Sequence, residues 1–378
     1  MRRLVKFDIV HPADYLAARK RAWGEALRSW SLEEYRARLN ALRSNYSDYY
    51  THPLNASGEW AAEEYYLMDA DFAEKVARAH LSLRERLALR ARAGRFALRY
   101  GRAFSYEMAV AEAYLRRVRP DVVFVRSQPF PSVWWQRFRA SSLLVARLSA
   151  RMPVHWHPEH FDLVYTDHPL FAEFFQLHGV DTRLNDQGFD TRVTAELAER
   201  PPQRDVAFVG GLGSVNFSQR TAFLEGFAER RPLEWWGYWW YSGRPMSDYP
   251  HLAAGYRGAT SGLEMYQTFR DTRVNLNDYV DTANGMGFNQ RLFEVLGVGG
   301  FLLTRAAHNF DGTFPEGIFA TYTDLDDCLG KVDYYLTREA ERREIAAAGA
   351  AFIRERYDFS RIAAAFRRDL EEALAARG

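Results

Sequence analysis

The sequence predicts an α/β protein built from two doubly wound parallel sheets. A length of 378 residues, with 47 % hydrophobic residues, suits two cores of roughly 150–200 residues each. Short apolar runs alternate with helical patterns both before and after position 200, which is typical of βα units. Between the two alternations lies the proline pair of segment 200–205, which neither a helix nor a central strand accommodates. We therefore expect domains at 1–199 and 200–357 and a closing helix at 358–378.

The first part of the chain predicts two strands among long helical stretches. Its strands are expected at residues 4–10 and 61–67, where apolar side chains cluster. Helices are expected at 12–42, at 46–55 and over 71–117, with breaks near Gly94 and Gly101.

Four further apolar runs complete the first domain. They are short, rich in β-branched residues and bounded by Pro, Gly, Asp or His, as buried parallel strands often are. The strands are expected at 121–126, 142–147, 163–166 and 182–184, with a helix at 169–177.

The second alternation predicts a sheet of the same kind. In open α/β sheets ligands bind outside the carboxyl ends of the strands, so the loops there are the candidate sites. Strands are expected at 206–209, 233–236, 274–276 and 301–304, and helices at 218–230, 262–270, 325–336, 338–356 and 359–376.

Composition narrows the protein class. The formal charge is +1, from 50 basic and 49 acidic residues, and gives no indication of a nucleic-acid or anionic-membrane partner. A single cysteine, Cys328, excludes an intramolecular disulfide and favours a reducing compartment. There is no signal-peptide core behind Arg2 and Arg3, and no apolar run of the ~20 residues that a membrane span needs. We expect a soluble, cytoplasmic protein.

A glycine-rich loop follows the strand at 206–209. Gly210, Gly211 and Gly213 allow a ligand to approach the backbone closely, and Arg220 in the next helix is placed to reach a phosphate. Residue 216 is Asn rather than the third glycine of a dinucleotide-binding fingerprint, and the next strand ends in aromatic rather than acidic residues. A nicotinamide-dependent oxidoreductase is therefore disfavoured.

The segment 289–304 carries the main functional signal. Arg291 and Glu294 lie three residues apart on a short helix that runs through glycines into an apolar strand. A helix start, an arginine fork and a carboxylate suit a diphosphate and a pair of sugar hydroxyls. An ordinary surface ion pair would give the same pattern.

This segment resembles the C-terminal half of GT-B glycosyltransferases, in particular the CgeB-like group related to glycosyltransferase families 1 and 4. The similarity includes the Arg291–Glu294 helix, the acidic and aromatic stretch from Tyr322, and the arginine-rich helix at Arg342. The similarity extends from about Phe161 to Arg367, and a weaker similarity to the same group is found at 46–58.

The resemblance implies a metal-independent transferase that uses a nucleotide-diphosphate sugar and no cofactor. The second domain would hold the donor and the first the acceptor, a saccharide, lipid or protein, with the last helix crossing back to the first domain. A general base is required if the anomeric centre inverts, and Asp48 is the candidate; Arg291 would stabilise the leaving diphosphate. The expected donor-binding residues are Gly210, Gly211, Gly213, Arg220, Trp236, Gly237, Tyr238, Asn289, Gln290, Arg291 and Glu294, and the expected acceptor-binding residues are Tyr46, Asp48, His52, Arg126, Ser127 and Gln128.

Two other motifs contain residues of the types that bind metal ions. Asp69 and Asp71 imitate the Asp-x-Asp motif of metal-dependent GT-A transferases, although an N-cap explains them more simply. The cluster of His155, His157 and His160 contains Pro158, which prevents the helix that would align metal ligands, so we interpret it as a loop.

A departure from the family pattern leaves one alternative open. Met286 stands eight residues before Glu294, where many retaining GT-B enzymes have a glutamate, in a loop rich in Gly and Asn. The stereochemical outcome therefore stays open, and so does a non-catalytic nucleotide-sugar- or glycan-binding protein on the same fold.

Overall fold

The computed structural model contains two compact units. It describes residues 1–44, 47–148, 156–184, 187–213, 217–240, 244–281, 285–287 and 289–377. The first unit comprises Met1–His11, Ala17–Asp186 and Ser360–Gly378, and the second comprises Pro12–Leu16 and Gln187–Phe359. The chain therefore leaves the first unit ahead of the proline pair and returns to it at the end.

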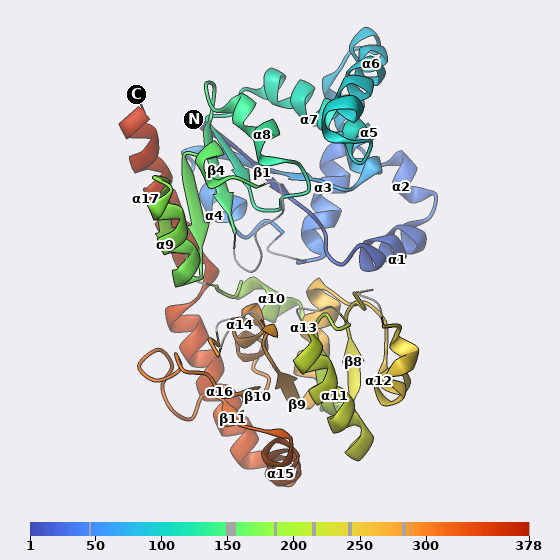
Figure 1. The fold of residues 1–378 in the computed structure, drawn as a ribbon, viewed down its shortest axis with the longest axis vertical. Helices are drawn as coiled ribbons and strands as arrows, with labels where there is room; N and C mark the ends of the chain where they lie inside the picture. Colours follow the sequence, from blue (N-terminus) through green and yellow to red (C-terminus); the bar gives the residue numbers. More distant parts are fainter. Residues whose placement is uncertain are drawn as a thin grey trace. The chain divides into compact units, whose positions relative to one another are not determined.

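The first unit contains a six-stranded parallel sheet of order β2-β1-β3-β4-β5-β6 (Figure 1). Because the second strand pairs on one side of β1 and all later strands follow on the other, the topological switch point lies between β1 and β3. The strands are β1 (Arg2–Asp8), β2 (Trp60–Tyr66), β3 (Val122–Val125), β4 (Leu143–Arg147), β5 (Leu163–Thr166) and β6 (Asp181–Leu184).

The helices of this unit correct two expectations. The stretch 12–42 is divided into three helices, and Ser31 begins the third through a capping box with Glu34. The stretch 71–117 does not break at Gly94, which lies inside a helix; it breaks at Leu81 and Ser82, because Ser82 forms a capping box with Glu85. The helices are α1 (Ala13–Trp23), α2 (Ala26–Ser29), α3 (Leu32–Ala41), α4 (Thr51–Ala56), α5 (Ala70–His80), α6 (Leu83–Tyr100), α7 (Ser105–Val118), α8 (Ser132–Trp135) and α9 (Pro169–Leu177).

The last helix, α17 (Phe359–Arg377), packs on the first unit. Its Phe366 ring lies 4.9 Å from the ring of Tyr50, 4.8 Å from that of Phe124 and 5.2 Å from that of Tyr165. The Tyr165 hydroxyl also donates a hydrogen bond to Asp369 at 2.9 Å. The core of the first unit is thus completed by the end of the chain.

The second unit contains a five-stranded parallel sheet of order β11-β10-β9-β7-β8, with its switch point between β7 and β9. The predicted class of two doubly wound parallel sheets is confirmed; β11 was not expected. The strands are β7 (Arg204–Val209), β8 (Glu234–Trp236), β9 (Thr272–Asn277), β10 (Leu302–Arg305) and β11 (Ala320–Tyr322), and the helices are α10 (Arg192–Glu196), α11 (Ser218–Arg230), α12 (Pro250–Gly255), α13 (Gly262–Arg270), α14 (Gln290–Gly297), α15 (Leu325–Leu336) and α16 (Glu339–Arg356).

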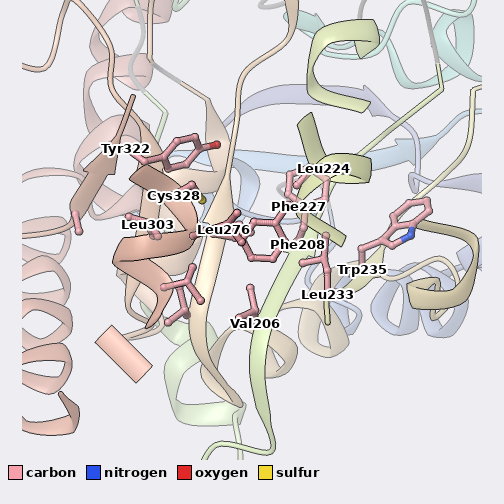
Figure 2. Close-up of a cluster of buried hydrophobic side chains, with 14 of the residues drawn as sticks. Val206, Phe208, Leu224, Phe227, Leu233, Trp235, Leu276, Leu303, Tyr322 and Cys328 are labelled. Carbon is pink, nitrogen blue, oxygen red and sulfur yellow. The ribbon is translucent and has the colours of Figure 1, made fainter. Parts of the chain in front are cut away.

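Helices close over this sheet through a continuous hydrophobic core (Figure 2). Phe208 from β7 and Leu276 from β9 meet Phe227 of α11, and all three are at most 2 % exposed. Cys328 of α15 lies in the same core, where burial raises the pKa of its thiol to about 12. This packing holds the strands in place and so determines the positions of the loops that follow their carboxyl ends.

Among the helices that the structure describes, none is long and apolar enough to cross a membrane.

Candidate functional site

The candidate site of the second unit lies at the switch point, where the strands β7 and β9 end. Ligands bind in this place in sheets of this order, because the loops leaving the two strands diverge there. The glycine-rich loop 210–213 leaves β7, and Asp278 and Tyr279 follow β9. The start of α14 reaches the same edge, since Asn289 contacts Asn277, the last residue of β9, at 2.9 Å.

Arg220 connects the loop that follows β7 with the loop that follows β9. It lies in α11 with 6 % of its surface exposed, and its guanidinium donates to the carbonyl oxygen of Gly211 and, at 3.2 Å, to that of Asp278. Burial lowers the pKa of this guanidinium to about 10, so it stays charged at neutral pH. Its hydrogen bonds hold the two loops together, and its positive charge lies next to both of them.

Arg305 fixes the β9 loop from the side. It ends β10, and its Nε and Nη2 donate to the two carboxylate oxygens of Asp278 at 2.7 and 3.0 Å. The guanidinium also lies over the rings of Phe223 and Tyr322, which stack 5.2 Å apart. A bidentate pair with stacked rings leaves this arginine little freedom.

A hydrogen-bonded network occupies the carboxyl ends of β9 and β10. The amide of Asn277 donates to Thr304 at 2.9 Å, and Thr304 is also 2.8 Å from the hydroxyl of Tyr279. Asn289, the N-cap of α14, donates to Asn277 and, at 3.4 Å, to the carbonyl of Asp278. Its side chain therefore makes no capping bond to α14 itself.

The glycine loop after β7 is shaped by the aromatic loop after β8. A Cβ on Gly211 would lie 2.6 Å from the ring of Tyr238, and one on Gly213 would lie 2.4 Å from that of Trp239. A Cβ on Gly237 would lie 2.0 Å from the carbonyl oxygen of Gly210, and the Gly210 N–H donates to the carbonyl of Trp236 at 2.9 Å. These glycines thus allow two loops to pack closely, whatever else they bind.

The rings of two expected donor-binding residues, Trp236 and Tyr238, also have protein neighbours. The guanidinium of Arg204 lies over the ring of Trp236, 5.1 Å from the centre of that ring, and Trp236 is partly exposed. Tyr238 forms an edge-to-face pair with Trp240 at 5.6 Å. Both rings stay at the carboxyl end of β8, next to the glycine loop.

Helix α14 brings the expected Arg291 and Glu294 together as an ion pair. Glu294 is 8 % exposed; burial raises the pKa of its carboxyl, and the charge of Arg291 acts in the opposite direction. The guanidinium also contacts the sulfur of Met265 at 3.1 Å and the ring of Phe269 at 4.8 Å, both from α13. The side chain of Gln290 does not join this pair; its amide donates to the carbonyl oxygen of Gly188 at 2.8 Å.

The corresponding edge of the first sheet also carries charge. Asp8 ends β1 and is 1 % exposed; it accepts two hydrogen bonds from Arg126 Nη1 at 2.9 Å and one from Ser127 at 2.6 Å. Lys6 lies 3.6 Å from the same carboxylate, and burial lowers the pKa of its ammonium. Two expected acceptor-binding residues, Arg126 and Ser127, thus converge on a carboxylate that the sequence analysis did not select.

The other expected acceptor residues make contacts of their own. Lys6 also donates to the carbonyl oxygen of Ser47, so the neighbouring Asp48 lies close to the same charged edge. Asp48 forms an ion pair with Arg43 at 2.9 Å, and His52 is exposed in α4. Gln128 accepts a hydrogen bond from the indole of Trp156 at 3.1 Å. Tyr46 lies outside the described residues.

The alternative with a GT-A metal site is wrong about the fold, because this chain has two separate parallel sheets. Asp69 is the N-cap of α5 and accepts from the Phe72 N–H at 3.0 Å, which confirms the capping interpretation. Lys20 contacts Asp69 at 2.6 Å and Asp71 at 2.8 Å.

The histidine motif forms a short 3₁₀ turn, Pro158–His160, and His155 lies outside the described residues. His160 is 2.9 Å from the hydroxyl of Ser132, and burial lowers the pKa of its imidazole. Within the described ranges, no group of three or more His, Cys, Asp or Glu could hold a metal ion.

Asp281 is a further residue that the sequence analysis missed. Its carboxylate accepts from the hydroxyl of Ser218 at 2.7 Å and from the N–H of Gln219 at 3.1 Å, so it caps α11 from the β9 loop. Asp8, Asp278 and Arg305 share one signal that could have found them: each is a charged residue that ends or directly follows an apolar strand.

Comparison with known proteins agrees with this architecture. Residues 219–368, less than half of the chain, match the family model described as "Glycosyl transferase-like". A search of curated proteins found no match.

Several solved structures have the same fold over the whole chain. HepE of Anabaena, in complex with UDP-glucose, has 13 % sequence identity and a TM-score of 0.57, with 100 % of both chains covered. Sucrose-phosphate synthase of Thermosynechococcus elongatus has 12 % identity and a TM-score of 0.55, also with 100 % of both chains covered. OtsA has 13 % identity and a TM-score of 0.53, with 98 % of this chain and 99 % of that chain covered. The chain therefore has the GT-B fold.

Proposed function

We propose that this chain is a glycosyltransferase that moves a sugar from a nucleotide-diphosphate donor to an acceptor, without a metal ion. The observation that carries the proposal is α14: it presents Arg291 and Glu294 on one face, at the carboxyl edge of the sheet, inside the segment that matches the "Glycosyl transferase-like" model. The GT-B fold and the motifs of the CgeB-like group support the same assignment.

The second unit supplies the chemistry that a nucleoside diphosphate needs. The side chain of the N-cap residue Asn289 does not cap α14, and the positive end of this helix's dipole favours a phosphate there. Both hydrogen bonds that the Arg291 guanidinium makes within the described residues use Nη1, which leaves other N–H donors for phosphate oxygens. Charge that develops on the departing diphosphate is stabilised by Arg291, by the field of Arg220 and by the helix start. Glu294 accepts hydrogen bonds from the ribose.

The acceptor is assigned to the first unit, where Asp8, Arg126 and Ser127 form a polar site at the switch point of its sheet. If the transfer inverts the anomeric centre, Asp48 acts as the general base. Replacing Asp48 by Asn then lowers kcat and leaves nucleotide binding unchanged. Unchanged kcat would remove Asp48 from the mechanism.

Nucleotide binding and sugar release test the proposal in one experiment. We expect UDP, GDP, dTDP or CMP to raise the melting temperature of the protein, and one nucleotide sugar to release its nucleotide on incubation. UDP is the first choice because HepE was solved with UDP-glucose. Stabilisation without release from any donor identifies a non-catalytic binding protein instead. No stabilisation and no release contradict both.

The variant Glu294→Gln locates the donor site. Hydrogen bonds to a charged acceptor contribute about 1.5–3 kcal/mol, so we expect the nucleotide Kd to rise roughly tenfold to a hundredfold. Glu339→Gln is the matched control, because Glu339 also forms a single ion pair, with Arg343 at 2.6 Å, but on the exposed face of α16. Equal affinities of the two variants would place the donor elsewhere.

A further inference from the structure

Helix α6 has one apolar face that the fold buries. Leu89 and Phe96, seven residues apart, are 2 % and 7 % exposed. The ring of Phe96 meets the ring of Trp134 at 6.5 Å and the guanidinium of Arg137 at 5.2 Å. This face attaches α6 to the rest of the first unit, beside α7 at its edge (Figure 1).

A second apolar face of α6 is left in the solvent. Leu83, Leu87 and Leu98 are 64 %, 64 % and 91 % exposed, and Ala91 and Gly94 lie between them along the helix. At about 100° per residue, these five positions fall within a sector of roughly 80°, nearly opposite Leu89 and Phe96. We call these five residues the outer seam. A helix that is apolar on two opposite faces normally buries both.

Arginines border the outer seam on both sides. Arg90 lies next to one edge of it, and Arg84 and Arg95 lie next to the other. The whole of α6 carries six arginines and one glutamate. The net charge of +1 for the chain hides this concentration, because acidic residues elsewhere balance it. Local charge therefore indicates an anionic partner where the overall charge does not.

More positive charge lies at the end of α7. Arg3, Arg116, Arg117 and Arg119, together with a single carboxylate, Asp121, line an open pocket of about 610 Å³ there. Because α6 and α7 pack on each other and only residues 101–104 join them, the end of α7 comes back towards the first turn of α6, and the pocket lies near it. Guanidinium groups of this kind suit phosphate-bearing headgroups.

We propose that α6 docks the first unit on an anionic lipid bilayer, with the outer seam in the interface and its arginines among the headgroups. Amphipathic helices that lie in the plane of a membrane combine exposed leucines with a cationic border in this way. The arginine stems add apolar contact while their charges stay in water. A soluble acidic partner explains the arginines but not the exposed leucines.

Sedimentation of the full chain with lipid vesicles tests this proposal. We expect the protein to bind vesicles of phosphatidylcholine and phosphatidylglycerol in equal parts, to bind much less to phosphatidylcholine alone, and to be released by high salt. Leu87→Ser should weaken binding to the anionic vesicles about tenfold, and Arg90→Glu should weaken it by a similar factor, because a positive charge is replaced by a negative one.

Two control variants distinguish binding through the outer seam from nonspecific adsorption to lipid. Leu170→Ser removes a leucine of similar exposure, 61 %, from α9, and Arg343→Glu reverses an exposed charge on α16; both should leave vesicle binding unchanged. All four side chains are exposed, so unchanged circular dichroism and melting temperature are expected throughout. Equal binding to both vesicle types, or equal losses in Leu87→Ser and Leu170→Ser, would overturn the proposal. So would binding to soluble heparin that needs the arginines but not Leu87.

Discussion

Replacing Arg305 by methionine tests how the candidate donor site is held in shape. Arg305 Nε and Nη2 donate to Asp278 at 2.7 and 3.0 Å, and the two side chains are unequally buried: 5 % of Asp278 is exposed, against 33 % of Arg305. The variant Arg305→Met leaves a carboxylate in the interior without its counter-ion. The variant Asp278→Asn leaves a guanidinium that can turn towards water. We therefore expect unequal losses of stability.

The size of the difference follows from burial. Removing one partner of a buried pair costs about 3–5 kcal/mol, and we discount this to about 2–4 kcal/mol for Arg305→Met because the arginine is partly exposed. For Asp278→Asn we expect about 1–2 kcal/mol, since the stranded charge is solvated. The double variant should resemble Asp278→Asn, because it contains no unpaired buried charge.

Urea unfolding at neutral pH, followed by tryptophan fluorescence and circular dichroism, measures these differences. Arg343→Met, which removes an exposed pair with Glu339, is the control and should cost less than about 0.5 kcal/mol. If Asp278→Asn were as destabilising as Arg305→Met, or if the double variant were worse than either, the argument from unequal burial would fail.

Three further outcomes follow from buried groups and close contacts. Because burial raises the pKa of Cys328 to about 12, iodoacetamide should leave this thiol unmodified at pH 8 until the protein is unfolded, as mass spectrometry can show. Burial raises the pKa of Glu64, so the folded state keeps this proton after the unfolded chain has lost it. Stability therefore falls as the pH rises from the ordinary glutamate pKa through the raised one, and Glu64→Gln should flatten this fall in urea midpoints measured across that range. Gly237→Ala should cost about 2–4 kcal/mol, because its φ is 145° and a Cβ would collide with the Gly210 carbonyl, whereas Gly312→Ala, with φ 78° and open space, should cost about 1 kcal/mol. Equal losses in the two alanine variants would show that the collision is relieved.

Local patterns predicted regular elements well where several signals agreed. Helices Pro169–Leu177, Ser218–Arg230, Gly262–Arg270 and Leu325–Leu336 have the expected bounds, because apolar spacing coincides there with proline, serine, glycine or aspartate at the start. The break expected at Gly94 was wrong, since packing of the neighbouring Phe96 outweighs the low helix propensity of one glycine. Strand β11 has only three residues, Ala320–Tyr322, and a threonine interrupts its apolar residues, so it shows no continuous apolar run.

The site was less predictable because its side chains act through distant partners. The spacing of Arg291 and Glu294 correctly predicted that they share one helix face. No local pattern shows that Arg220 binds the carbonyl of Asp278, or that Asp281 caps α11 from another loop. Asp8 receives Arg126 across more than a hundred residues of sequence, a pairing that only the strand order brings about. Such contacts depend on topology, which single residues do not encode.

The return of α17 to the first unit makes the second unit, in effect, an insertion within the first. Tyr50, Phe124 and Tyr165 contact Phe366, so a chain cut short ahead of Ser360 would present three aromatic rings to water. During synthesis on the ribosome, these rings stay uncovered until the second unit and α17 have been made. Chaperone engagement at this stage, and aggregation of prematurely terminated chains, are the natural consequences of closing a core with its last helix.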